Sequence, residues 1–125
     1  MRPIKFRVWN KDKDKFEDIE NIAVYFDEIG IDVYTKSGSV LESYELNQYT
    51  GLKDKNGKEI FEGDIVKAYE SNIICEVIFS EGAMFMLRWN DTKWGNNEYH
   101  HYGLGAFTLE VIGNIYEDKH LLEEV

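Results

Sequence analysis

Apolar and polar residues alternate along much of this chain, which is the period of a β-strand with one buried face. At the start, Ile4, Phe6 and Val8 alternate with Lys5 and Arg7. The same kind of pattern predicts three further strands, separated by glycine-containing turns, at residues 22–26, 31–35 and 40–46. The first 47 residues are therefore expected to be β-structure.

The clearest hairpin is predicted in the second half of the chain. Apolar residues occupy every second position of residues 73–79 and again of residues 83–89, with a short turn at residues 80–82. Met84 and Met86 lie on the other face of the return strand, where they are either buried or form an apolar surface patch. Burial is favoured because methionine commonly fills gaps in a core.

The C-terminal segment predicts one more strand and a short helix. Residues 109–116 are mainly apolar and contain a glycine, which favours a closing strand with a β-bulge. After it, Asp118 is placed to cap a short helix, in which Leu121, Leu122 and Val125 share one side. We expect that side to pack on the sheet.

Residues 48–66, QYTGLKDKNGKEIFEGDIV, hold the densest turn signals of the chain. Asn56 and Gly57 predict a tight turn, and a glycine–aspartate step at residues 63–64 precedes a β-favouring run. Calcium binding by Asp54, Asn56 and Glu59 is disfavoured because the glycine stands at the wrong position for a helix-flanked calcium loop. We expect the acidic residues here to be turn and surface residues: Asp54, Glu59, Glu62 and Asp64.

This order of elements predicts the all-β class. Residues 48–125 have the inventory of a small SH3-like barrel with a short C-terminal helix, in which closure removes exposed strand edges. Residues 1–47 are too few for a comfortable core of their own. We expect this N-terminal β region to pack against the barrel and not to fold independently.

Residues 91–105 form the longest segment without a clear period, and three glycines lie within it. Its aromatic residues are candidate anchors for a partner protein, since loops commonly carry binding residues. The alternative, that they fold back over one end of the barrel, is equally open. The residues concerned are Trp94, Tyr99, His100 and Tyr102.

The amino-acid composition is typical of a globular protein. The 125 residues are 43% hydrophobic and 14% aromatic, which is enough for a core, and apolar runs fall short of the ~18 residues that a membrane span needs. The N-terminus lacks the apolar core of a signal peptide, and a single cysteine cannot form an internal disulfide. These features predict a cytoplasmic protein without membrane association.

The formal net charge is −10, with 24 acidic and 14 basic residues. Since Lys and Arg supply most of the affinity for nucleic acid phosphates, direct nucleic-acid binding is disfavoured. Acidity that only maintains solubility is the simplest interpretation.

The residue types for catalysis or cofactor binding do not form a recognisable pattern. His100 and His101 are adjacent, so on a regular element they cannot face one metal ion together. Cys75 lies on the apolar side of its predicted strand and is expected to be unreactive. We therefore predict no catalytic, cofactor-binding or metal-ligating residues. We also predict that the protein is not an enzyme.

Three segments together resemble the YopX family of phage and prophage proteins: residues 4–9 (IKFRVW), residues 48–66 and residues 109–117 (LEVIGNIYE). The resemblance spans the chain, and residues 48–66 are its most specific part. It implies a β-rich fold with an SH3-like barrel and a protein that acts inside the bacterial host cell. It implies no catalytic residues.

Three hypotheses for function follow. The first is a non-enzymatic module that binds a host or phage protein. The second is a homo-oligomer that associates through the first 47 residues or the Met84 and Met86 face. The third is an acidic mimic of nucleic acid that occupies the basic groove of a host protein.

Overall fold

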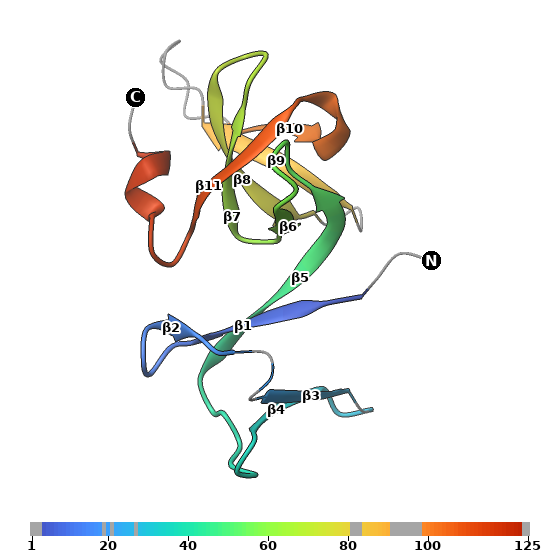
Figure 1. The fold of residues 1–125 in the computed structure, drawn as a ribbon, viewed down its shortest axis with the longest axis vertical. Helices are drawn as coiled ribbons and strands as arrows, with labels where there is room; N and C mark the ends of the chain where they lie inside the picture. The colour runs from blue at the N-terminus through green and yellow to red at the C-terminus, as the bar shows by residue number, and fades with distance from the viewer. Residues whose placement is uncertain are drawn as a thin grey trace. The chain divides into compact units, whose positions relative to one another are not determined.

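The computed structural model describes residues 4–18, 20, 22–26, 28–80, 84–90 and 99–123. Its contacts divide the chain into two compact units (Figure 1). One unit is Lys5–Gln48, and the other is Tyr49–Val125 together with Met1–Ile4. Whether the first unit can fold on its own stays a prediction.

The Lys5–Gln48 unit consists of short antiparallel strands. Strand β1 pairs on one side with β2, where Trp9 lies opposite Phe16, and on the other side with the first part of β5. Val8 and Trp9 are buried, as the alternation in β1 predicts. The bounds are β1 Phe6–Asn10, β2 Lys15–Phe16, β3 Ile22–Phe26, β4 Ile31–Thr35 and β5 Tyr44–Lys53.

Strands β3 and β4 form a two-stranded antiparallel hairpin within this unit. Val24 lies opposite Val33, and Val33 is completely buried. The far edge of β4 is covered by the chain that follows it, because the Leu41 N–H donates to the Val33 carbonyl at 2.8 Å. The predicted strand at residues 40–46 is wrong in its bounds: Val40 forms only an isolated bridge, and the regular strand begins at Tyr44.

The second unit holds a five-stranded antiparallel sheet in the order β10-β9-β8-β7-β11 (Figure 1). The predicted hairpin of residues 73–89 is confirmed, with Val77 opposite Leu87. The fully buried residues of this unit include Ile60, Val66, Cys75, Val77 and Leu87. Its strands are β6 Glu59–Phe61, β7 Asp64–Ala68, β8 Ile73–Phe79, β9 Phe85–Asn90, β10 Tyr99–Gly103 and β11 Leu109–Asn114.

The predicted bulge in the closing strand is also confirmed. The pairing of β11 with β7 shifts register between Val111 and Gly113. A Cβ atom at Gly113 would lie only 2.7 Å from the Cβ of Asp118, so this position has no room for a side chain. Asp118 accepts a hydrogen bond from the Asn114 N–H at 3.1 Å, which holds the chain close after the strand.

The all-β prediction is confirmed. The described residues are mostly strand, and their helical segments are short 3-10 turns, among them η2 Leu104–Ala106 and η3 Lys119–Leu122. The curled antiparallel sheet is consistent with an SH3-like barrel. No helix in this part of the chain is long and apolar enough to span a membrane.

Three details differ from the prediction. Residues 99–103 belong to β10 and not to an irregular loop, because they find backbone partners on β9. Met84 is half exposed and not buried. At the C-terminus, a 3-10 turn replaces the expected helix, and the Asp118 side chain bonds backward to Asn114 instead of capping that turn.

Candidate functional site

Asp54, in the middle of the sequence motif at residues 48–66, is a structural centre of the second unit. It is only 8% exposed, which corrects the expectation of a surface residue. Its Oδ1 accepts the N–H groups of Asn56 and Lys58, both at 2.9 Å, and its Oδ2 accepts the N–H of Val111 at 2.9 Å. One carboxylate therefore closes the turn at residues 54–58 and fastens it to β11.

These contacts favour the charged form of Asp54. Burial on its own would raise the pKa of this carboxyl. The backbone hydrogen bonds from Val111, Lys58 and Asn56, helped by the positive charge of Lys58, outweigh burial and hold the pKa of Asp54 below its ordinary value. The carboxylate accepts from three backbone N–H groups of the chain, so Asp54 is engaged in the fold and not in ligand binding.

Asp64, the other acidic residue predicted at the surface, is also buried, with 1% exposure. Its Oδ2 accepts the N–H of Phe61 at 2.8 Å, three residues earlier. The glycine before it, Gly63, has a φ of 87°, which other residues rarely adopt. This glycine–aspartate step makes the tight turn from β6 into β7, as the sequence predicts.

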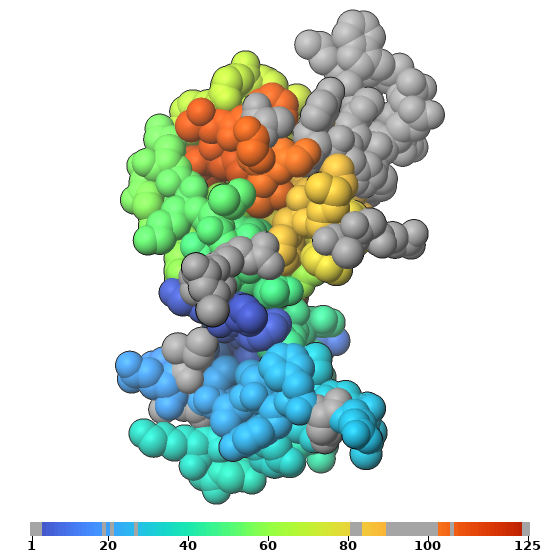
Figure 2. All heavy atoms as spheres, turned by 90° about the vertical axis from the view of Figure 1, so that its right-hand side faces the viewer, coloured from blue at the N-terminus to red at the C-terminus, as the bar shows by residue number. Residues whose placement is uncertain are grey.

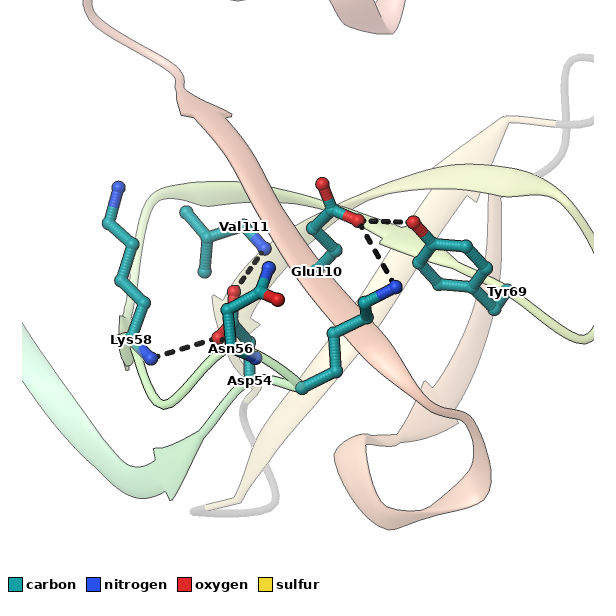
Figure 3. A network of polar contacts seen from close by, with 7 residues as sticks. Asp54, Asn56, Lys58, Tyr69, Glu110 and Val111 are labelled. Carbon is teal, nitrogen blue, oxygen red and sulfur yellow. Dashed lines mark hydrogen bonds and ion pairs between the residues drawn. The ribbon is translucent and has the colours of Figure 1, made fainter.

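A second polar network lies beside Asp54 (Figure 3). The Tyr69 hydroxyl donates to Glu110 Oε2, the Lys55 ammonium lies 3.9 Å from the same oxygen, and it also lies 4.0 Å from the centre of the Tyr69 ring. The members are partly exposed, and they connect the turn after β5 with the end of β7 and with β11. Their contacts are made with one another, which favours a structural role.

The predicted aromatic anchors are only partly covered by the structure. Trp94 lies outside the described residues. Tyr99, His100 and Tyr102 belong to the backbone of β10, where His100 pairs with Trp89 and Tyr102 pairs with Leu87. These three therefore stand on a strand of the sheet, and their role in binding stays a prediction.

Metal and thiol chemistry find no support in the described part of the chain. Among the described residues there is no group of three or more His, Cys, Asp or Glu placed to hold a metal ion. Cys75 is completely buried, and burial raises the pKa of its thiol to about 12. A thiol with this pKa holds its proton at neutral pH and is a poor nucleophile.

Exposed apolar residues gather on the β3–β4 hairpin. Of the ten large hydrophobic residues that are exposed in the described chain, five lie within residues 25–40. Ile29, between the two strands, is 97% exposed. We call three of these residues the hairpin tip: Phe26, Ile29 and Ile31.

The same hairpin carries an open groove of about 650 Å³. Its aromatic walls are Tyr25 and Tyr34, which meet edge to face with ring centres 5.5 Å apart. Asp32, directly opposite Tyr25, and Glu20 also line it, while Lys36 contributes a positive charge. We call this surface the hairpin groove. Figure 2 shows the segment around β3, in light blue, at the molecular surface.

The sequence contained the signal for this groove. In the predicted strands 22–26 and 31–35, Ala23, Tyr25 and Tyr34 fall on the face opposite to that of Val24 and Val33. The structure confirms this separation, since Val24 pairs with the buried Val33 while Ala23 pairs with Tyr34. Two outward-facing tyrosines on a short hairpin, next to an aspartate, could have been identified as a candidate site.

The comparison with protein families identifies the family of this chain. The model of the family described as YopX protein matches residues 5–123, which is nearly the whole chain. This chain belongs to the YopX family. The resemblance inferred from the three sequence segments is thereby confirmed.

A solved structure is similar to this YopX-family protein. It is the crystal structure of protein EF1440 from Enterococcus faecalis, with 25% sequence identity and a TM-score of 0.56. The alignment covers 98% of this chain and 99% of the other. A comparison with curated proteins gives no match. The similarity therefore extends over both units, and it carries no statement of activity.

Proposed function

We propose that this YopX-family protein is a non-enzymatic protein–protein interaction module, and that the β3–β4 hairpin is its docking element. The observation that carries this proposal is the concentration of exposed apolar residues at the hairpin tip. Phe26, Ile29 and Ile31 lie within six residues of one another, and each is more than two-fifths exposed. Contiguous apolar surface on a soluble domain is typical of interaction sites.

Folding does not account for this exposure. The register places Phe26 and Ile31 on the same face of the hairpin as Val33; Val33 is completely buried, whereas these two residues at the end of the strands stay exposed. Phe26 still contacts the ring of Phe6, with ring centres 5.4 Å apart, but 56% of its surface stays open. An isoleucine that is almost fully exposed adds nothing to a core, so a role in contacting another protein is the better explanation for Ile29.

The setting of the interaction follows from the family. The YopX resemblance implies a phage or prophage protein, and we propose that it acts in the cytoplasm of the bacterial host. Its partner would then be a host or phage protein that meets the hairpin there.

Affinity capture with matched variants tests the proposal. The immobilised wild type, Ile29→Thr and Leu52→Thr proteins are incubated with lysate of phage-infected cells, and bound proteins are quantified by mass spectrometry. Leu52 is an exposed leucine of the other unit, so its variant controls for loss of any surface aliphatic residue. A protein retained by wild type and Leu52→Thr but lost from Ile29→Thr supports the proposal. Equal retention by all three overturns it.

Homo-oligomerisation is the second candidate, and the same tip favours it. The hairpin lies within the first 47 residues, where a subunit interface was predicted. Light scattering of the purified protein over a range of micromolar concentrations distinguishes the two. A mass that rises with concentration in the wild type, but not in Ile29→Thr, assigns the hairpin to a self-interface, and a constant monomer mass excludes that role.

A further inference from the structure

The hairpin groove carries chemistry beyond apolar contact. Tyr25 is 60% exposed and presents an aromatic surface to solvent. Asp32 stands directly opposite it on β4 and forms no ion pair or side-chain hydrogen bond with the described residues. An open aromatic face beside an unpaired carboxylate is the combination that attracts a cationic side chain.

The charges along the groove are not symmetrical. Glu20, which precedes β3, and Lys36, which follows β4, line the end far from the hairpin tip, where their charges offset each other. At the other end Asp32 lines the groove, and the lining residues at that end, Tyr25 and Asp32, include no lysine or arginine. The end near the tip therefore favours a positive charge, and the acidic excess of the whole chain adds to this preference.

The backbone of β3 indicates the shape of the ligand. β3 pairs only with β4 in the described chain, and the hairpin is a two-stranded sheet. The far edge of β4 is occupied by residues 39–41, through the Thr35 N–H to Ser39 carbonyl bond of 2.7 Å and the Leu41 bond. The outer edge of β3 is thus the side on which an extended chain can add, using the N–H and C=O groups that point away from β4.

From these three observations we propose that the hairpin binds an extended segment of a partner protein that pairs with the outer edge of β3 and places an arginine or lysine over Tyr25 and beside Asp32. This inference rests on the proposed function and names the class of partner. The apolar tip then contacts the partner next to that segment. The arrangement combines backbone pairing, which gives affinity, with one charged pocket, which gives specificity.

Synthetic peptides test this inference without knowledge of the partner. The probe is a seven-residue peptide of alternating threonine and arginine, which favours an extended conformation and carries three positive charges. One control peptide replaces arginine by glutamate. A second keeps the arginines but replaces two threonines by proline, which removes backbone donors. Binding to the full chain is followed by amide chemical shifts at about 150 mM salt, where non-specific charge attraction is screened.

We expect the arginine peptide to shift the amides of residues 22–26 and 32–36, and to bind more tightly than both control peptides. Asp32→Asn and Tyr25→Thr should each weaken it by about threefold to fivefold, which is the scale of one exposed cation–π or ion-pair contact. Asp12→Asn is the matched control, since Asp12 is an exposed aspartate of the same unit outside the groove, and it should leave binding unchanged.

Two results overturn the inference. One is equal binding of the arginine and glutamate peptides, and the other is an effect of Asp12→Asn as large as that of Asp32→Asn. If either result is found while Ile29→Thr still loses the captured protein, the hairpin remains the proposed docking element. Only the cationic segment as its ligand is then excluded. If Ile29→Thr retains every captured protein, the proposed function itself fails, whatever the peptides do.

Discussion

The Oδ2 atom of Asp54 lies 2.9 Å from the backbone nitrogen of Val111, 57 residues further along the chain. This bond joins the turn of the motif at residues 48–66 to the closing strand of the sheet. The Lys55 N–H donates to the Leu109 carbonyl at 2.9 Å and adds a second bond between the same two segments. The motif at residues 48–66 therefore serves the architecture of the second unit.

Removing the Asp54 carboxylate should destabilise the protein strongly. Asp54→Ala leaves three backbone N–H groups without their acceptor, and we expect the free energy of unfolding to fall by about 3 kcal/mol. Urea denaturation measures this change. Asp12→Ala, at an exposed aspartate, is the control and should stay within about 0.5 kcal/mol of the wild type.

Asp54 should also make stability depend on pH. Because the pKa of this carboxyl is lower in the folded than in the unfolded protein, its stabilisation is complete above the unfolded pKa of about 3.9 and is lost as the pH falls through the folded pKa. The difference in unfolding free energy between wild type and Asp54→Asn should be largest near about pH 6 and should shrink below about pH 4. A difference that stays constant down to the lowest pH would contradict this origin.

Gly113 should not tolerate a side chain. The added Cβ of Gly113→Ala meets Asp118 at 2.6 to 2.8 Å, and we expect a loss of about 1–3 kcal/mol in unfolding free energy. Gly105→Ala is the control, because nothing lies within 4 Å of the Cβ that it adds. In the double variant Gly113→Ala/Asp118→Gly the collision is absent, so its loss should be smaller than the sum of the two single losses. Additive losses would place the strain elsewhere.

Cys75 should be protected in the folded state. With its thiol buried and a pKa of about 12, reaction with an aromatic disulfide reagent should be slower by on the order of 100-fold or more than in urea-unfolded protein. The chain has one cysteine, so the absorbance change reports this residue alone. Equal rates in the folded and unfolded protein would show that the β7–β8–β9 core opens readily.

Local patterns predicted the elements whose signals lie within a few residues of each other. The β8–β9 hairpin follows from apolar residues at every second position of both segments, among them Val77 and Leu87, and the bulge follows from Gly113 in an apolar run. The sequence also places β3 and β4 correctly. In each case the deciding interaction is a strand period or a backbone preference that the residues themselves carry.

Other features depend on residues that are distant in the sequence. The role of Asp54 was missed because its decisive donor, Val111, stands on another strand. Strand β10 was missed because His100 and His101 break the alternation, and only pairing with β9 makes the segment regular. The hairpin groove was not predicted, although the period of the two strands sets Tyr25 and Tyr34 on the face opposite to that of Val24 and Val33. The register then places Tyr25 opposite Asp32.

The affinity of the captured partner for hairpin variants tests the central claim most directly. Isothermal titration calorimetry of the purified partner with the wild type and with Tyr25→Thr/Ile29→Thr should show a Kd at least about tenfold weaker for the variant. Its free energy of unfolding should stay within about 0.5 kcal/mol of the wild-type value, because both side chains are largely exposed. An unchanged Kd in a stable variant would contradict the assignment of the β3–β4 hairpin as the docking element.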